Sequence, residues 1–301
     1  MKATKLTPFL SERIWGGDRL TRYGKDAAAG GIGESWELSF IDGCESTVAG
    51  TPVSEHFPRS TWGTRAQRFE RFPVLTKFID AKDNLSVQVH PDDTYALREE
   101  GSYGKTEMWI VLEAEEGAGL YLGFRETMTS EDVRRYAEDG TLENYLDFRP
   151  VTAGDVFFIP AGTVHAIGRG VLLYEIQQSS DLTYRLYDYH RRDAAGRLRE
   201  LHVDRALRVS ELCPYDPPKV AGDDPSVVGE CSYFTTRICK LNCANKTFFV
   251  DETSFLMLTV MDGEGEIDGQ RAVKGDTFFI PAAAGEITAS GTVTLAAVSL
   301  G

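Results

Sequence analysis

The sequence has little that would place the protein in a membrane or outside the cell. Hydrophobic residues make up 42% of its 301 residues, but no apolar run approaches the roughly 20 residues that a membrane-spanning helix needs. Residues 1–8 contain lysines and lack the apolar core of a secretory signal peptide. The five cysteines are odd in number and lack Cys-x-x-Cys spacing, which argues against a disulfide framework and a zinc knuckle. We therefore expect a cytoplasmic protein without a membrane partner.

Positive charge is also scarce. The chain has 32 Lys and Arg residues against 46 Asp and Glu, which gives a formal net charge of −14. Nucleic-acid binding needs a basic surface, so this composition argues against a nucleic-acid partner. If the ligand is a small anion, a few Lys and Arg must gather in one cleft against this acidic background. Arg191 and Arg192 are candidates for that cluster, although a solvated loop explains the pair equally well.

Histidine is rare, with five residues in the chain, so its placement is informative. Residues 154–165 predict a strand, a tight turn at Pro160 and Gly162, and a returning strand that begins at His165. A single histidine on a strand is more often a surface or hydrogen-bonded residue than a ligand. His165 therefore needs further candidate ligands before it indicates a metal site.

Such candidates lie upstream. The segment that ends at His90 alternates between apolar and polar side chains, which places Gln88 and His90 on one face of a strand. Glu107 follows at the start of another apolar strand. Two imidazoles, a carboxylate and an amide oxygen at strand ends are a reasonable ligand set for a divalent metal. We predict a metal site that joins these side chains to His165.

Residues 154–165 also match a family signature. The pattern Gly, five residues, Pro, one residue, Gly, two residues, His resembles the second metal-binding motif of the cupin family, although Arg169 stands where that motif often ends in Asn. Further segments resemble type I mannose-6-phosphate isomerases in their short bacterial form, in the same order along the chain: 12–17, 33–37, 72–81, 85–93, 105–109 and 183–189.

This resemblance implies a reaction and a cofactor. The reaction is the interconversion of mannose 6-phosphate and fructose 6-phosphate by proton transfer through an enediol or enediolate, with a small sugar phosphate as the partner. The cofactor is one Zn²⁺ per chain, although nitrogen and oxygen ligands also accept manganese or cobalt. The ligands that the resemblance implies are Gln88, His90, Glu107 and His165. A monomer is the default expectation.

The resemblance also assigns roles around the metal. Arg185 is implied as an essential catalytic cation, which stabilises the enediolate or holds a substrate oxygen. Glu175 is implied as the base, and we expect burial to raise its pKa toward neutrality. Two alternatives stay open: Arg185 forms a structural salt bridge, and Glu175 orients a metal ligand. Contacts with the substrate's phosphate or hydroxyl groups are expected from Lys105, Ser86 and Arg191.

An internal repeat indicates two related domains. The motif Gly-Asp-x-Phe-Phe-Ile-Pro-Ala occurs at 154–161 and again at 275–282, which predicts a mainly β fold of two cupin-type (jelly-roll) β-barrels. The second copy has Glu286 at the position of His165, so we expect it to hold no metal. The predicted boundaries are a catalytic cupin domain at 1–213 with a small helical insertion near 129–147, a linker at 214–226, and a degenerate barrel at 227–301.

Two other classes of protein stay open at this point. Another metal-dependent cupin enzyme, either a dioxygenase or a different sugar-phosphate isomerase, would share the barrel, but oxygenase cupins typically resemble a three-His-plus-Glu set and this chain has Gln88. A non-catalytic sugar-binding cupin would not need the metal ligands together with Lys105 and Arg185. An oxygen-uptake assay run beside an isomerase assay separates the oxygenase from the isomerase.

Overall fold

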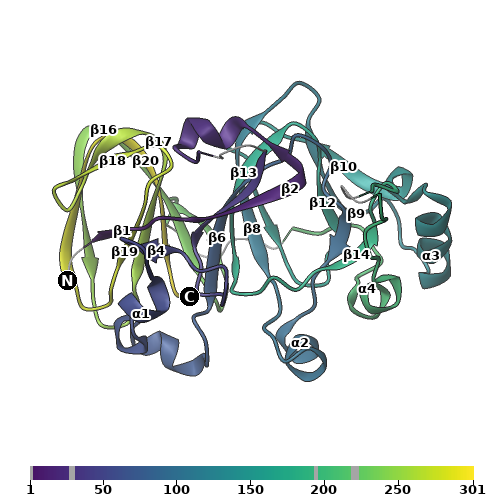
Figure 1. Ribbon diagram of the computed structural model, residues 1–301, viewed down its shortest axis with the longest axis horizontal. Coiled ribbons are helices and arrows are strands. Elements are labelled where there is room, and N and C mark those ends of the chain that lie inside the picture. The colour runs from purple at the N-terminus through teal and green to yellow at the C-terminus, as the bar shows by residue number, and fades with distance from the viewer. Residues whose placement is uncertain (1–2, 27–30, 193–195, 218–223) are drawn as a thin grey trace.

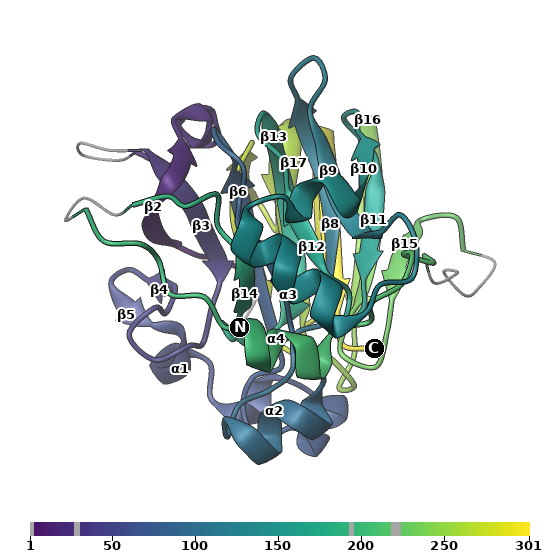
Figure 2. The ribbon, with the colours of Figure 1, turned by 90° about the vertical axis from the view of Figure 1, so that its right-hand side faces the viewer.

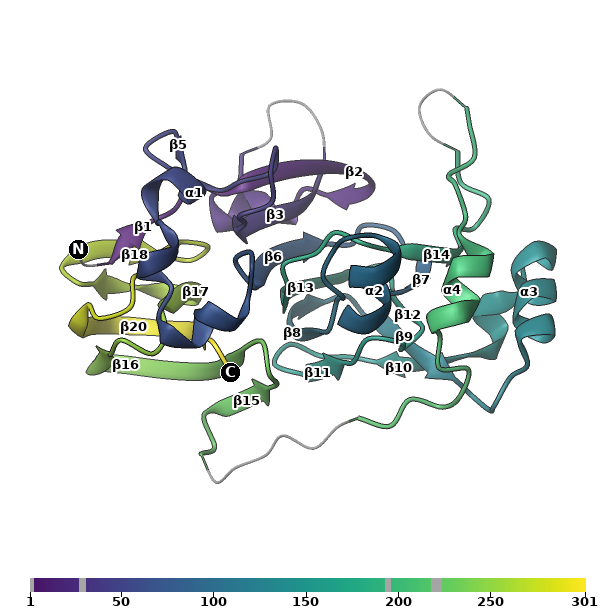
Figure 3. The same cartoon turned by 90° about the horizontal axis from the view of Figure 1, so that it is seen from below.

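The computed structural model describes residues 3–26, 31–192, 196–217 and 224–301. These residues form three large antiparallel sheets that follow one another along the molecule, with short helices outside them (Figures 1 and 3). None of the helices described is long and apolar enough to cross a membrane. The prediction of a mainly β fold is confirmed.

The central sheet separates two hydrophobic cores. Alternate residues of its strand β13 (Val171–Gln178) point to opposite faces of the sheet. Leu172 and Tyr174 enter the core shared with the C-terminal sheet. Leu173 enters a second core, on the side where a cavity lies between this sheet and the next. Polar residues of β13 that lie on the same face as Leu173 therefore point toward the cavity. In spatial order the strands are β11 (Val156–Ile159), β8 (Glu107–Ala114), β13 (Val171–Gln178), β6 (Val74–Asp80), β3 (Ile32–Leu38) and β2 (Phe9–Gly17).

A second sheet faces the central one across the cavity. Its strands, in spatial order, are β10 (Leu146–Pro150), β9 (Gly119–Phe124), β12 (His165–Ile167), β7 (Val87–Val89) and β14 (Tyr184–Tyr187). Helices cover its outer face (Figure 2), namely α3 (Ser130–Asp139), the 3-10 helix η4 (Leu142–Tyr145) and α4 (Val203–Val209). Val133, Ala137 and Ala206 of these helices pack against Val87 and Ala166 of the sheet. The predicted helical insertion therefore lies behind the sheet, away from the cavity.

The C-terminal sheet forms the third layer. Leu258 and Phe278 point into its own core, whereas Met257 and Phe279 point into the core shared with the central sheet. The N-terminal strand β1 completes this sheet by pairing with β19. In spatial order the strands are β1 (Thr4–Lys5), β19 (Thr277–Ile280), β17 (Leu256–Ile267), β20 (Gly285–Ser299), β16 (Thr235–Val250) and β15 (Val227–Glu230), with β18 (Gln270–Val273) on β17.

Small elements fill the connections. Helix α2 (Asp93–Glu99) follows His90 closely and was not predicted. Part of the predicted linker, residues 218–223, lies outside the described residues. The remaining elements are η1 (Arg19–Tyr23), β4 (Thr47–Val48), β5 (Thr51–Pro52), α1 (Val53–His56), η2 (Arg59–Thr61) and η3 (Thr64–Arg68).

Candidate metal centre and active-site cavity

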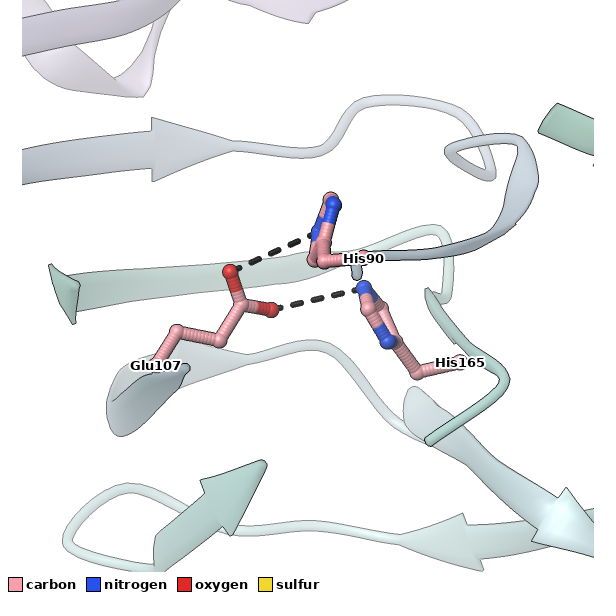
Figure 4. Close-up of side chains that lie close together, drawn as sticks. All are labelled: His90, Glu107 and His165. Atoms are coloured by element: carbon pink, nitrogen blue, oxygen red, sulfur yellow. Dashed lines mark ion pairs between the residues drawn. The ribbon is translucent and has the colours of Figure 1, made fainter. Parts of the chain in front are cut away.

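Three segments bring candidate ligands to one point between the central and second sheets. In the pairing of β7 with β12, Gln88 lies opposite His165, so the two side chains leave the same face of the sheet. His90 comes directly after β7, where Pro91 ends the strand. Glu107 is the first residue of β8 in the facing sheet. Figure 4 shows His90, Glu107 and His165 pointing toward one another.

The ligand atoms are buried and close together. Glu107 Oε1 lies 3.3 Å from His165 Nε2, and Glu107 Oε2 lies 3.6 Å from His90 Nε2. One ligand atom from each of these three residues lies within 4.8 Å of the others. Gln88 Nε2 is 3.3 Å from His165 Nε2. Because a side-chain amide can exchange its nitrogen and oxygen by a flip, Gln88 can present its oxygen at this point.

Backbone carbonyls hold the two imidazoles in the same tautomer. His90 Nδ1 lies 2.9 Å from the carbonyl oxygen of Leu182. His165 Nδ1 lies 2.9 Å from that of Thr163. A carbonyl only accepts hydrogen bonds, so each Nδ1 donates and each Nε2 turns its lone pair toward the cluster, where the Lys105 ammonium lies 3.2 Å from His90 Nε2. Burial, and secondly the charge of Lys105, lowers the pKa of His165 to about 4 and that of His90 well below its ordinary value. Both rings are therefore neutral at pH 7.

Glu107 shows that a cation fits this site. Its Oε1 is buried and has no hydrogen-bond partner among the described residues, while its Oε2 pairs with the ammonium of Lys105. Burial raises the pKa of Glu107 to about 8 although Lys105 acts in the opposite direction. A cation that displaces the Glu107 proton would meet two neutral imidazoles, a carboxylate and an amide oxygen, which suit Zn²⁺. Among the described residues, no second cluster of three or more metal-ligating side chains occurs.

The metal centre adjoins a cavity of about 510 Å³ between the two sheets. Gln88, Lys105 and Glu175 form the part of the lining that lies next to the centre. Ser86 also lines the cavity, and its hydroxyl lies 3.2 Å from Gln88 Oε1. The structure therefore places Lys105 and Ser86, both predicted to contact substrate, on the wall of one cavity.

Glu175 lies beside the centre, but its pKa shifts against our expectation. Trp109 Nε1 donates to Glu175 Oε2 at 2.9 Å, and the ammonium groups of Lys77 and Lys105 lie 3.6 and 3.8 Å from Oε1. Burial raises the pKa of Glu175, but the two lysines and the indole outweigh burial and lower it. The predicted rise toward neutrality was wrong because the sequence did not reveal these partners. Glu175 is an ionised carboxylate, and none of the residues that the structure describes hydrogen-bonds its buried Oε1.

Three arginines line the same cavity, namely Arg13, Arg185 and Arg199. Arg13 pairs with Glu34 at 2.8 Å, and Arg199 pairs with Asp188 at 3.2 Å. Burial lowers the pKa of Arg185 and of Arg199, and the positive charge of Arg13 lowers both further. Within the described part of the chain, the buried Arg185 Nε has no hydrogen-bond partner. Guanidinium groups gathered in this way attract an anionic ligand into an acidic protein.

Arg191 is placed differently from Arg185. It is absent from the described residues that line this cavity. Its guanidinium pairs with Asp188 and donates to the carbonyl oxygen of Asn84. Asp188 is the same carboxylate that Arg199 contacts. The geometry therefore gives no support to the predicted direct contact between Arg191 and substrate, and it places Arg199 on the cavity wall instead.

Sequence reasoning gave no role to several residues of the cavity. Arg13 and Glu34 fall in segments that carry the family resemblance, but no spacing singled them out. Lys77 interrupts the apolar strand β6, where it lies on the same face of the strand as Leu75 and Ile79. A charge inside a strand that is buried on both faces was the available signal for Lys77.

Comparisons with known proteins agree with this geometry. The family model described as phosphomannose isomerase type I, catalytic domain, matches residues 4–113, and that described as mannose-6-phosphate isomerase, cupin domain, matches residues 226–300. Mannose-6-phosphate isomerase ManA of Bacillus subtilis (strain 168) is 36% identical over 301 residues, which cover 94% of either chain. The mannose-6-phosphate isomerase of Streptococcus mutans is 37% identical over 289 residues, which cover 90% of either chain.

Solved structures share the whole fold. The crystal structure of the mannose 6-phosphate isomerase from Bacillus subtilis matches with a TM-score of 0.89 and 31% identity, over 99% of either chain. A mannose 6-phosphate isomerase bound with zinc and yttrium matches in fold with a TM-score of 0.76 and 17% identity, over the full length of both chains.

Fold and site together define a metal-dependent enzyme of the cupin class. Within that class, the chain belongs to the type I mannose-6-phosphate isomerases, which are metal-dependent aldose–ketose isomerases. Family membership decides against the oxygenase and the non-catalytic binding protein that the sequence left open.

Proposed function

We propose that this protein interconverts mannose 6-phosphate and fructose 6-phosphate by moving a proton between C2 and C1 of the open-chain sugar through an enediolate. The observation that carries the proposal is the cavity itself, where a cluster of metal-ligating side chains, an ionised carboxylate and three arginines meet in a chain of this family. The reaction needs a base for the C2 proton and positive charge near the two reacting oxygens.

The proposed ligands of one Zn²⁺ are Gln88, His90, Glu107 and His165. When bound, a divalent cation supplies positive charge and Lewis acidity beside the carbonyl and hydroxyl oxygens of the sugar. Two observations support this assignment. Glu107 Oε1 has no hydrogen-bond partner among the described residues. The Nε2 lone pairs of His90 and His165 point toward the same place. Manganese and cobalt suit the same ligands, so cellular supply contributes to metal identity.

Glu175 is the proposed base. Its lowered pKa keeps it ionised at neutral pH, and its Oε1, which faces two ammonium groups without a hydrogen bond, can accept the C2 proton and return it to C1. Lys105 remains a cation, because Glu107 and Glu175 raise its pKa more than burial lowers it. We propose that Lys105 and Ser86 donate hydrogen bonds to substrate oxygens at this end of the cavity.

Arg185 is the proposed catalytic cation. Its register partner in β7 is Gln88, so it leaves the sheet next to the metal centre, where it can stabilise the charge of the enediolate. Arg13 and Arg199 are proposed to hold the phosphate, since both line the cavity and each is held by a carboxylate, Glu34 and Asp188 respectively. Arg191 acts indirectly in this scheme, by binding the Asp188 carboxylate that positions Arg199.

The domain boundaries and cellular context belong to the same proposal. Residues 1–213 form the catalytic unit, 214–226 the linker and 227–301 the degenerate barrel, with β1 added to the sheet of that barrel. The described cysteines are free thiols, which supports a reducing, cytoplasmic environment. We propose a monomer that needs a sugar phosphate and a metal ion as its partners.

An assay coupled to fructose 6-phosphate formation, with zinc content measured by elemental analysis, tests the proposal. The Arg185→Ala variant is expected to lose at least a hundredfold in kcat and to retain its zinc, because it removes transition-state charge stabilisation and leaves the ligands intact. The matched control is Arg134→Ala, which removes an exposed arginine of α3 that pairs with Asp204. Loss of zinc or of folding in Arg185→Ala would make Arg185 structural, and a zinc-loaded wild type without turnover would overturn the proposed reaction.

A further inference from the structure

The segment 104–106 carries Lys105 and leads into Glu107, and hydrogen bonds hold it on both sides. Lys105 N donates to the carbonyl oxygen of Pro91 at 3.0 Å. Thr106 N donates to the side-chain oxygen of Gln178 at 2.8 Å. The segment therefore joins the turn that follows His90 to the end of β13.

Gly104 shows how closely this segment packs. A Cβ atom on Gly104 would lie 2.5 Å from the backbone carbon of Asp92, inside the range where backbone atoms must move. Gly104 N also donates to Asp93 Oδ1 at 2.7 Å. Any displacement of the turn at 91–93 is therefore passed directly to the segment that positions Glu107.

Asp93 connects this segment to the C-terminal half of the chain. Its Oδ1 accepts from Gly104 N and, at 2.8 Å, from the side-chain nitrogen of Gln178. Its Oδ2 accepts from the hydroxyl of Tyr233 at 2.7 Å. Tyr233 lies between β15 and β16, on the C-terminal side of the predicted linker. Burial and the Asp93 carboxylate both raise the pKa of Tyr233, so its hydroxyl stays protonated and donates.

We propose that Tyr233 and Asp93 are positioning residues of the metal centre, through which the degenerate barrel holds Glu107 in its ligating position. The inference rests on the proposed role of Glu107 as a ligand. The chain of hydrogen bonds runs from Tyr233 to Asp93, to Gln178 and Gly104, and so to the backbone on either side of Lys105. Outer partners of metal ligands restrict the ligand to one orientation, which favours the bound over the free state.

Zinc dissociation from the full-length protein, measured by competition with a chromogenic chelator, tests this inference without a turnover assay. Asp93→Ala should release zinc about tenfold faster than wild type, at the lower limit for outer partners of metal ligands. Tyr233→Phe, which removes one of the three bonds to Asp93, should release it about threefold faster. In the cobalt-substituted protein, both variants should also broaden the visible ligand-field bands, because Glu107 samples more than one position.

The matched control is Tyr174→Phe, which also removes a tyrosine hydroxyl that bonds across to the C-terminal sheet, at 2.9 Å from Thr259 Oγ1. Tyr174 points into the core shared by the two sheets, so its loss should lower stability without changing zinc release or the cobalt spectrum. The inference is overturned if Tyr174→Phe releases zinc as fast as Tyr233→Phe, or if Asp93→Ala releases it at the wild-type rate. A wild type that binds no zinc would overturn the proposed function first, and this inference with it.

Discussion

Glu34 lies at the edge of the cavity and is almost fully buried, yet it is ionised. Burial alone would raise its pKa, but the charges of Lys77 and Arg13 and hydrogen bonds from Arg13 and Trp36 lower it to about 2. The ammonium of Lys77 also lies 4.5 Å from the ring centroid of Trp36. One carboxylate therefore orders the wall on which Arg13 is presented.

The stability of the protein should depend on Glu34 in a defined pH range. A carboxylate with a lowered pKa contributes stability above its unfolded pKa of 4.5, and this contribution is lost as the pH falls toward the folded value of about 2. The shift corresponds to roughly 3 kcal/mol at pH 7. Urea unfolding of wild type and Glu34→Gln should show a gap of that order at pH 7 that narrows between pH 5 and pH 3. A gap that stays constant with pH would show that Glu34 acts through packing alone.

At this scale the sequence predicted the four ligand candidates that meet, but it missed other residues of the cavity, such as Lys77, and part of the electrostatics. Gln88, His90 and His165 were found because strand alternation fixes the face on which a residue lies. The direction of the Glu175 pKa shift was wrong, because it depends on Lys77, a neighbour from another strand whose distance no pattern in the sequence gives.

At the scale of single elements, α3 shows how local signals specify a helix. Thr129 accepts a hydrogen bond from Asp132 N at 3.1 Å and so caps the first turn, and Gly140 ends the helix in the left-handed conformation with φ of 72°. Val133 and Ala137 face the outer side of the second sheet. The sequence predicted this helix because its capping residues are local.

Removal of the cap should cost stability without changing catalysis. Thr129→Ala is expected to lower the free energy of unfolding by about 1 kcal/mol, because the N–H of Asp132 loses its acceptor. The value of kcat should stay at the wild-type level, since α3 lies behind the sheet that carries His165. Chemical denaturation and the coupled assay give the two readouts, and a fall in kcat would show that α3 affects the cavity.

Helices α2 and α4 were not predicted, for a physical reason. Each is only seven residues long, and helices of that length are stable mainly through tertiary packing. Ala96 and Ala206 are their buried residues. Such contacts join segments far apart in the chain, so a local sequence pattern does not reveal them.

For the whole molecule, the core shared by the central and C-terminal sheets is the main structural link. It is rich in aromatic side chains, among them Phe57, Phe72, Phe255 and Phe279, and the rings of Phe57 and Phe279 lie 4.3 Å apart between centroids. The C-terminal sheet contributes Met257, Phe279 and Val298 to this core. The prediction that the repeat forms a second β unit was possible because its motif is nearly identical, but the shared core could not be predicted from either copy alone.

This core should make the two halves unfold together. Phe279→Ala is expected to destabilise the protein by about 3–5 kcal/mol, because it removes a fully buried aromatic ring from the core shared by both sheets. Differential scanning calorimetry should show a single transition in both proteins, and the transition of the variant should lie at a lower temperature than that of the wild type. Two separate transitions in the wild type would show that the two halves of the protein fold independently.

The pairing of Thr4 with Phe279 and of Lys5 with Phe278 has a consequence for synthesis on the ribosome. Strand β1 finds its neighbour only after the long stretch of chain between Lys5 and Phe278 has been translated. Until then its backbone groups stay exposed to water or to other nascent chains, and chaperones that shield such edges have a long opportunity to bind this strand.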